Sequence, residues 1–294
     1  MRQVLFPFLL ITLIWGSTWI VIRDQLGPVP PSWSVSYRFF IASAAMFAYA
    51  RAGGVSLRLT RHGAAFAGVV GTLQFAMNFN FVYQAEHYIT SGLVAVVFAL
   101  LLVPNTALAR IFLGEPVSRG FLLGSAIAIA GVILLFVHEL RADEGATEGV
   151  LLGIGLTILG VLSASAANVM QATKRARSIP IASLLAWAML AGACIDAAYA
   201  FATSGPPVFE ARLGYVAGLV YLALFASALA FTLYYRIIRA IGPGRSAYSS
   251  VLVPIIAMAL STMFEGYRWS SLAAAGGVLA MTGLVIALRS RPAA

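Results

Sequence analysis

Long apolar segments recur from one end of this chain to the other. Ten stretches of mostly apolar residues follow one another along the 294 residues, and about 20 such residues in a helix cross a hydrocarbon core of roughly 30 Å. Charged residues make up only 10% of the chain, against roughly 25% in soluble domains. We therefore expect an all-α integral membrane protein with ten transmembrane helices, near residues 5–22, 33–50, 63–84, 90–110, 120–137, 149–171, 181–203, 214–235, 246–264 and 270–288.

The basic residues are distributed unevenly between the two sides of these segments. If the N-terminus lies in the cytoplasm, fourteen Lys and Arg residues fall on the inner side and only Arg23, Arg141, Arg212 and Arg268 on the outer side. Such an excess is typical of cytoplasmic loops. The formal charge of +9 therefore indicates a multi-pass topology with both termini cytoplasmic, and we expect the lipid bilayer, not nucleic acid, as the partner.

A proline, a glutamate and two glycines recur in two stretches of the chain. In both stretches the glutamate follows the proline by 11 residues, and the two glycines are 7 residues apart. The residues are Pro104, Glu115, Gly124 and Gly131 in the first stretch, and Pro254, Glu265, Gly276 and Gly283 in the second. The offset of 150 to 152 residues is about half the chain, which indicates two homologous halves.

We place the first half at residues 1–138 and the second at 149–294, joined by a periplasmic loop at 139–148. Five helices in each half is an odd number, so the second half enters the membrane inverted relative to the first. Two inverted five-helix repeats can exchange conformations and so open a central site to each side in turn. The predicted architecture is that of an alternating-access membrane protein.

Polar side chains inside the predicted spans mark its interior. Arg38 lies about a turn and a half into the second span, where it must either snorkel to the headgroups or face a hydrated interior. Gln74 and Asn78 share one stripe of the third span, and amides that face lipid lose hydrogen bonds. This stripe therefore contacts other helices or lines a cavity.

Pro104 and Pro254 are expected to kink the fourth and ninth spans, because each removes a backbone hydrogen bond. The kinks free the carbonyl groups of Leu100 and Ser250. Free carbonyls at membrane depth are tolerated beside protein or water. Paired kinks therefore predict an internal pathway between the halves.

Asp196 is the one carboxylate well inside a predicted span. It either pairs with a polar neighbour or titrates in a proton-coupled cycle, and both interpretations are open. Cys194 is the only cysteine, so no intrachain disulfide can form. The three histidines have no metal-ligand spacing, and no nucleophile has a neighbouring base. We expect no metal, no cofactor, no catalytic residue and no enzyme activity.

The chain resembles the EamA type of the drug/metabolite transporter superfamily, and within it the YddG-type aromatic amino-acid exporters. The similarity covers nearly the whole chain and rests on Trp15-Gly16-Ser17-Thr18, Arg38-Phe39, Leu113-Gly114-Glu115-Pro116 and the repeated Pro/Glu/Gly pattern. The resemblance implies an exporter of small metabolites in a bacterial inner membrane, with ten helices around a central cavity. Related cation exporters carry a glutamate in the first span, and sugar-phosphate carriers have several embedded basic residues. This chain has neither, which favours a neutral or zwitterionic solute.

We predict export of an aromatic or apolar amino acid that binds between the halves near the two kinks. Aromatic side chains would stack on the solute, and polar ones would bind its head group. An exporter of another neutral or zwitterionic metabolite or drug is the main alternative, ahead of a channel or a membrane-embedded enzyme. The predicted binding residues are Trp19, Arg38, Gln74, Asn78, Phe79, Asn168, Gln171, Trp187, Tyr248 and Ser249.

Overall fold

The predicted apolar segments are helical. In the computed structural model, which describes residues 2–142, 147–246 and 249–290, each of the ten predicted ranges contains a helix. No strand occurs within these described ranges. The prediction of an all-α protein is confirmed.

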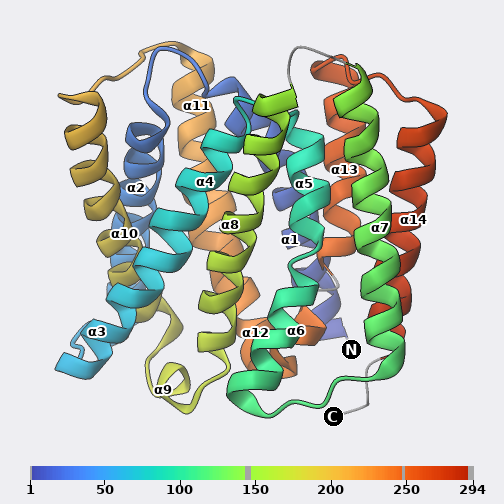
Figure 1. The fold of residues 1–294 in the computed structure, drawn as a ribbon. Helices are drawn as coiled ribbons and strands as arrows, with labels where there is room; N and C mark the ends of the chain where they lie inside the picture. The colour runs from blue at the N-terminus through green and yellow to red at the C-terminus, as the bar shows by residue number, and fades with distance from the viewer. Residues whose placement is uncertain (1, 143–146, 247–248, 291–294) are drawn as a thin grey trace.

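The helices run between an upper and a lower end of one bundle, as oriented in Figure 1. α1 (Arg2–Asp24) begins at the lower end, and α14 (Ser271–Arg289) returns to it. The chain changes direction at each end, so that successive long helices are antiparallel. The remaining elements are α2 (Pro31–Ala52), α3 (Arg61–Val70), η1 (Gly71–Met77), α4 (Asn78–Ala85), α5 (Ser91–Ala99), α6 (Leu102–Leu113), α7 (Arg119–Ala142), α8 (Thr147–Gln171), α9 (Lys174–Arg177), α10 (Ile181–Ser204), α11 (Leu213–Tyr221), η2 (Leu222–Leu229), α12 (Ala230–Ser246) and α13 (Ser249–Phe264).

Eight helical segments of the described chain are long and apolar enough to cross a membrane. Two of the ten predicted spans are not among them. α2 is less apolar because it carries Arg38 and Arg51, and the apolar part of α13 is the shorter stretch Leu252–Phe264. The other eight segments are enough to support the prediction of a multi-pass membrane protein.

The two prolines have different local effects. α5 ends at Ala99 and α6 begins at Leu102, two residues before Pro104. The carbonyl of Leu100 accepts a hydrogen bond from the backbone N–H of Val103 at 2.8 Å, so the predicted free carbonyl is satisfied by a tighter turn. In the second half, α13 continues through Pro254 without interruption.

Two π-helical segments interrupt the bundle in its interior. η1 follows α3, and η2 follows α11, and they begin at Gly71 and Leu222. These positions are 151 residues apart, which lies within the offset of 150 to 152 residues between the two copies of the repeated stretch. A π-helix has a wider turn than an α-helix and is frequent at functional sites. The 3.6-residue pattern of the sequence did not predict either segment.

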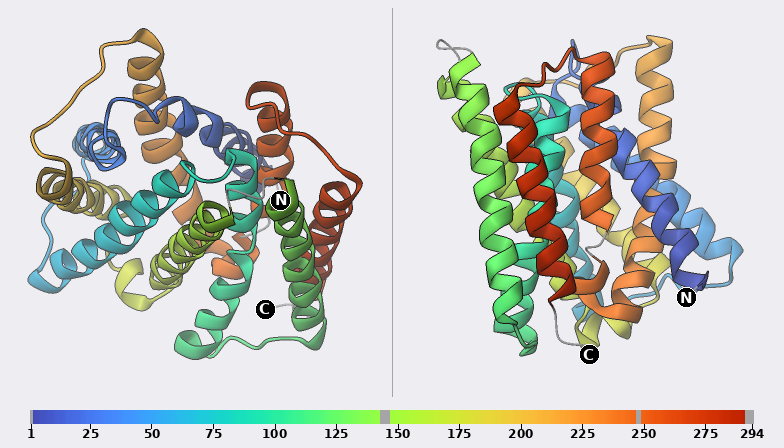
Figure 2. Two further views of the ribbon diagram at one scale, coloured as in Figure 1. Left: turned by 45° about the horizontal axis from the view of Figure 1, so that its top comes forward. Right: turned by 90° about the vertical axis from the view of Figure 1, so that its right-hand side faces the viewer.

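α7 and α14 lie side by side along their length, as the right panel of Figure 2 shows. Elsewhere α2 packs against α10, α1 against α13, and α4 against α8. The largest cluster of buried apolar residues draws on both halves of the chain. The halves therefore share one interior and do not form separate domains with independent cores.

Candidate functional site

A cavity lies in this shared interior, with a volume of about 90 Å³. Its wall includes residues of α1, α2, η1, α4, α5, α8, α12 and α13. A second hollow of about 730 Å³ lies between α5, α13 and α14, and no charged residue lines it. The central cavity is therefore the better candidate for solute binding, because it combines apolar walls with a few converging polar groups.

Six of the ten predicted binding residues line the central cavity: Trp19, Arg38, Gln74, Asn78, Phe79 and Asn168. They come from five elements and from both halves of the sequence. The two predicted kinks also adjoin it, because Leu101 and Val253 contribute to the wall.

Arg38 is the only charged residue in the cavity wall as described. Its side chain is 1% exposed, so it faces the protein interior and does not snorkel. Its Nε donates to Ser227 Oγ at 2.9 Å, and its Nη1 donates to Tyr83 Oη at 3.5 Å. Among the described residues no carboxylate forms an ion pair with it. Its positive charge is thus unpaired inside the membrane protein.

The guanidinium of Arg38 is held by aromatic rings. Its Cζ lies 4.4 Å from the centre of the Phe79 ring and 5.3 Å from that of Phe39. A cation over a ring face is stabilised by about 2 kcal/mol or more when water is excluded. Ser227 is itself fixed, because its Oγ donates to the carbonyl of Leu222 within η2 at 2.8 Å. The π segment therefore positions a partner for the buried arginine.

Amide oxygens converge on the same cavity. The Gln74 Oε1, Asn78 Oδ1 and Asn168 Oδ1 atoms are buried and accept no hydrogen bond from any described residue. Trp19 Nε1 is likewise a buried donor without a partner in the described chain. Unpaired buried polar atoms are costly, and ligand binding is one way to satisfy them.

Aromatic residues outside the predicted binding set complete the wall. Trp15 packs edge-on against Tyr234, with ring centres 4.8 Å apart, and lies 5.4 Å from Phe231. Trp19 lies 5.4 Å from Phe98. Phe231 could have been found from the repeat, because it lies 152 residues after the predicted Phe79, within the offset of 150 to 152 residues between the two halves.

Other predicted binding residues lie away from the cavity wall. Trp187 is 39% exposed, and its Nε1 donates to the carbonyl of Leu57 at 2.9 Å. It packs edge-on against Phe47 and so anchors the exterior of α10. Gln171 is fully buried near the end of α8 but does not line the cavity. Tyr248 and the side chain of Ser249 lie outside the described residues.

Asp196 does not line the cavity either. Its Oδ1 accepts from Asn80 Nδ2 at 2.5 Å, and Asn80 Oδ1 accepts from Ser32 Oγ at 2.6 Å. This chain of hydrogen bonds joins α10, α4 and α2. Of the two roles that the sequence left open for Asp196, pairing with a polar neighbour is the one that this geometry favours.

Replacing Asp196 with asparagine is expected to leave transport and its response to a pH gradient unchanged. An asparagine oxygen at this position still accepts from Asn80. Asp196→Leu removes the acceptor, so the partly buried Asn80 amide loses its hydrogen bond to residue 196 and keeps only the one to the carbonyl of Ala76, which costs about 1–3 kcal/mol. Thermal unfolding of both variants in detergent, beside flux with and without a pH gradient, tests this. A lost pH response in Asp196→Asn at unchanged thermal stability would assign Asp196 to proton coupling.

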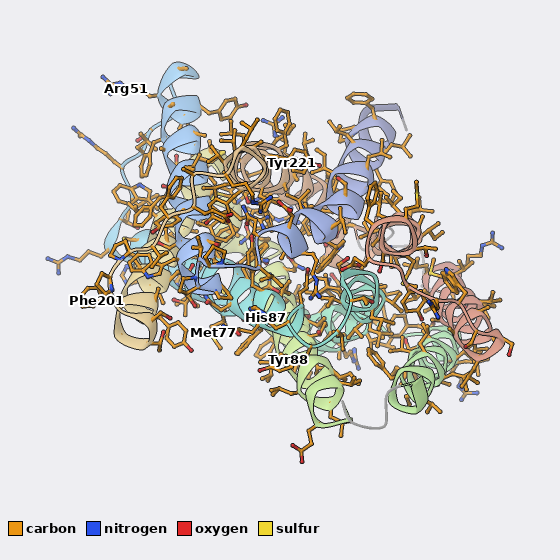
Figure 3. All side chains as sticks on the ribbon, turned by 90° about the horizontal axis from the view of Figure 1, so that it is seen from above. Arg51, Met77, His87, Tyr88, Phe201 and Tyr221 are labelled. Carbon is orange, nitrogen blue, oxygen red and sulfur yellow. The ribbon has the colours of Figure 1, made fainter. Side chains whose placement is uncertain are left out.

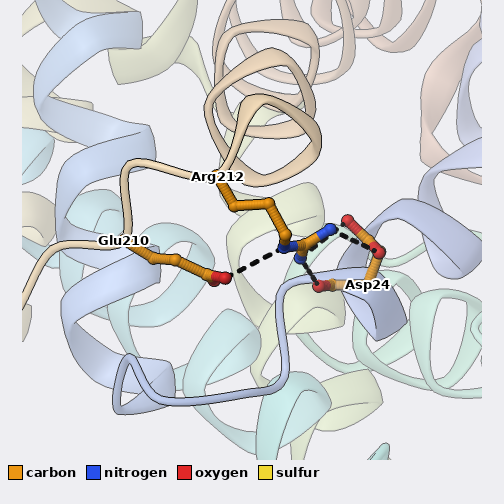
Figure 4. A network of polar contacts seen from close by, with 3 residues as sticks. All are labelled: Asp24, Glu210 and Arg212. Atoms are coloured by element: carbon orange, nitrogen blue, oxygen red, sulfur yellow. Dashed lines mark hydrogen bonds and ion pairs between the residues drawn. The ribbon is translucent and has the colours of Figure 1, made fainter.

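The two ends of the bundle differ in their charged groups. At the upper end Arg212 joins α1 to the loop before α11, since it donates to Glu210 Oε1 at 2.9 Å and to both carboxylate oxygens of Asp24 at 3.2 Å (Figure 4). Figure 3 looks down on this end, where His87 and Tyr88 lie near the middle of the bundle. The lower end carries the basic segment α9.

A bundle of apolar helices around a small, partly polar cavity defines a multi-pass membrane protein with an internal cavity. The chain belongs to the EamA-like transporter family, whose pattern matches it twice, at residues 3–137 and 151–289. This membership confirms the resemblance seen in the sequence.

Similar proteins include several bacterial transporters. Protein PagO of Salmonella typhimurium is 25% identical over 90% of this chain and 86% of its own length. A probable amino-acid metabolite efflux pump of Escherichia coli is 28% identical over 95% of this chain and 92% of its own. One solved crystal structure, at 20% identity, superposes with a TM-score of 0.70 and covers 99% of this chain and 98% of that one, which shows the shared fold.

Proposed function

We propose that this protein exports aromatic or apolar amino acids across a bacterial inner membrane by alternating access. The observation that carries this proposal is the unpaired Arg38 in a cavity whose other polar groups are amide oxygens. A buried cation suits a carboxylate, because charge-assisted hydrogen bonds are the stronger ones. The amide oxygens of Gln74, Asn78 and Asn168 suit an ammonium group, which only donates hydrogen bonds. A zwitterion presents both.

The side chain of the solute would lie among the aromatic residues. Trp15, Trp19, Phe79 and Phe231 offer apolar ring faces around the same cavity. Rings in offset or edge-on contact gain about 0.5–1.5 kcal/mol beyond burial of their area. The names of two relatives agree with this class: an efflux pump for amino-acid metabolites and a probable terminal-alkyne amino-acid exporter.

Ten membrane spans in two inverted repeats are part of this proposal, with halves at residues 1–138 and 149–294. The family pattern matches once in each half. The helix contacts agree with a two-fold relation between the halves. α2 of the first half packs on η2 of the second, and α10 of the second half packs on η1 of the first. The equivalent helices α2 and α10 also pack against each other, as do α7 and α14. The two π segments share the offset of the repeat.

We assign the lower end to the cytoplasm. The loops and helix ends there carry most of the basic residues, as the positive-inside rule requires. Relatives from Escherichia coli are named inner membrane transporters. The basic residues of the lower end are Arg51, Arg58, Arg61, Arg110, Arg119, Lys174, Arg175, Arg177, Arg236, Arg239 and Arg289.

The small size of the cavity supports alternating access. Small-molecule sites usually measure about 300–1,000 Å³, well above the cavity of about 90 Å³. An amino acid therefore enters only when the halves move apart, and the inverted repeat permits such opening toward either side. In this proposal the structure represents a nearly closed form.

Flux measurements in liposomes test this function. Purified protein is expected to carry labelled phenylalanine and tryptophan with saturation and counterflow, and threonine more slowly because it lacks an aromatic ring. Liposomes without protein are the control. Flux that never saturates would indicate a channel, and no flux of any of the three would contradict amino-acid transport and favour another neutral or zwitterionic solute.

A further inference from the structure

The upper end of the bundle holds a second group of polar side chains, which we call the upper-end cluster: Arg23, Glu86, Ser91 and Glu265. Arg23 lies in the last turn of α1, Glu86 directly follows α4, Ser91 begins α5, and Glu265 directly follows α13. The cluster thus joins the ends of four helices, one of them from the second half of the chain.

Glu265 ties these helix ends together. Its Oε2 accepts from Ser91 Oγ at 2.6 Å, and its Oε1 accepts from the Ser91 backbone N–H at 3.3 Å. Arg23 Nε lies 3.7 Å from Glu265 Oε1, and Arg23 Nη1 donates to the backbone carbonyl of Glu86. The contacts cross from the first half to the second, so they must break if the upper ends separate.

The cluster covers the cavity at a distance of about one helical turn. Ile22, Val82 and Ala95 line the cavity wall. Arg23 follows Ile22 directly, whereas Glu86 and Ser91 are each four residues from a wall residue on the upper side, which is one turn of a helix. The cluster is therefore a closed mouth between the cavity and the upper surface.

Glu86 is the member that the contacts leave unsatisfied. Its residue is fully buried, and neither carboxylate oxygen has a hydrogen-bond partner among the described residues. An ionised carboxylate buried without a partner is very unfavourable, and such a group takes up a proton instead. Burial, and next the negative charge of Glu265, raise the pKa of Glu86 well above its ordinary value, against the opposing effect of Arg23.

The other titratable side chains nearby do not supply Glu86 with a hydrogen bond or a second positive charge. Tyr83, one turn earlier on α4, donates its hydroxyl to Gln25 Oε1 at 3.0 Å. Partial burial and Arg23 lower the pKa of His87, so its side chain adds no positive charge near neutral pH. Arg23 is thus the cation that faces both carboxylates, and it cannot neutralise two negative charges.

We propose that Glu86 is a proton-binding site and that the bound proton holds the upper mouth closed. Opening would separate the ends of α1, α4, α5 and α13 and bring water to Glu86, where the carboxylate ionises easily. The closed form therefore binds the proton more tightly than the open form. By linkage, protonation favours closure. This site needs no solute and goes beyond the amino-acid transport proposed above.

The direction of the pH effect follows from the two forms. An exposed glutamate has a pKa of about 4.3, and the pKa of the closed form is higher. At a pH below the lower of the two pKa values, protonation stabilises the closed form relative to the open form by its full amount. As the pH rises through the window between the two values, the ratio of closed to open molecules falls by up to about tenfold per pH unit, and above the higher pKa it is constant.

The lower mouth has the same glutamate but lacks the proton site. Glu115 repeats Glu265 in the first half, and its Oε1 would lie 3.9 Å from a Cβ atom at Gly242, which repeats Ser91 at an offset of 151 residues. Over the repeat's offset of 150 to 152 residues, Glu86 corresponds to Arg236, Ile237 or Ile238. None of these is a carboxylic acid, so the lower mouth has no counterpart of Glu86.

Distances between spin labels at the upper end test the proposal without any solute. Labels are attached at Tyr88→Cys and Arg268→Cys, both exposed in the structure, in a Cys194→Ser background and in lipid nanodiscs. Double electron–electron resonance is recorded from pH 5 to pH 9 in sodium-free choline buffer and again in sodium buffer. A single short distance is expected at pH 5, and a longer population is expected to grow by about tenfold or more by pH 9.

Three variants locate the effect. Glu86→Gln mimics the protonated side chain and should keep the short distance at every pH. Glu265→Gln removes the neighbouring negative charge, so the midpoint should move to lower pH. Glu148→Gln, an exposed acid at the upper end of α8, should behave as the unaltered protein.

Either of two results would overturn the proton site. One is a wild-type distance distribution that is the same at all pH values, and the other is a pH response that persists in Glu86→Gln. A transition that follows sodium at constant pH would instead assign the carboxylates to a metal cation. Each result stands whether or not phenylalanine is transported, so failure of one proposal leaves the other intact.

Discussion

Replacing Arg38 with methionine is expected to raise the KM for phenylalanine by about 10- to 150-fold, or to abolish measurable flux. The fold-change corresponds to the loss of a hydrogen-bonded charge partner, about 1.5–3 kcal/mol. Saturation curves in liposomes measure it. The protein should still fold, because Ser227 keeps its bond to Leu222 and Tyr83 keeps its bond to Gln25, and removal of an unpaired charge relieves the cost of burying it.

A solute that lacks the carboxylate separates recognition from general damage. Competition by 2-phenylethylamine should be much weaker than that by phenylalanine in the unaltered protein, and the two should become similar in Arg38→Met. Arg236→Met is a matched control, since Arg236 is exposed on α12 and donates to Tyr49 Oη at 3.2 Å. If Arg38→Met still prefers phenylalanine by the original factor, the carboxylate is bound elsewhere.

Apolar periodicity predicted the helices because a span needs about 20 apolar residues and little else. Interruptions inside the spans were harder to predict. η1 and η2 contain ordinary apolar sequence, and nothing in Gly71–Met77 or Leu222–Leu229 differs in composition from α-helix. Their turns are set by packing against other helices: a Cβ atom on Gly192 of α10 would lie 2.6 Å from Phe75 Cβ in η1.

The residues of the candidate site were predictable where the polarity of the side chain alone excludes it from lipid and places it in the protein interior. Arg38, Gln74, Asn78 and Asn168 are too costly to place in lipid, and all four line the cavity. Aromatic residues carry no such constraint, because a ring is stable in lipid, at an interface or in a cavity. Trp187 was therefore expected in the site and lies on the exterior, whereas Phe231 lines the wall and was not expected.

The repeated glycines were read in the sequence as evidence of duplication, but the structure gives them a physical role. A Cβ atom placed on Gly124 of α7 would lie 2.6 Å from the carbonyl oxygen of Gly283 of α14, and one on Gly131 would lie 2.6 Å from that of Gly276. Each copy of the motif thus packs against the other. Small residues let helix backbones approach closely, and dispersion contacts hold them where lipid provides no hydrophobic force.

Gly283→Ala is therefore expected to destabilise the protein by about 1–3 kcal/mol, the usual cost of an overpacked core, and Gly283→Val by more. The added methyl group would meet the backbone of Gly124 and Ala128, and backbone atoms cannot rotate away as a side chain can. Thermal unfolding followed by size-exclusion chromatography measures the loss. Gly155→Ala on α8 is the control: no atom lies within 4 Å of its added Cβ, and alanine in place of glycine favours a helix by about 1 kcal/mol. Equal stability of Gly283→Ala and Gly155→Ala would mean that α7 and α14 are not held together by this contact.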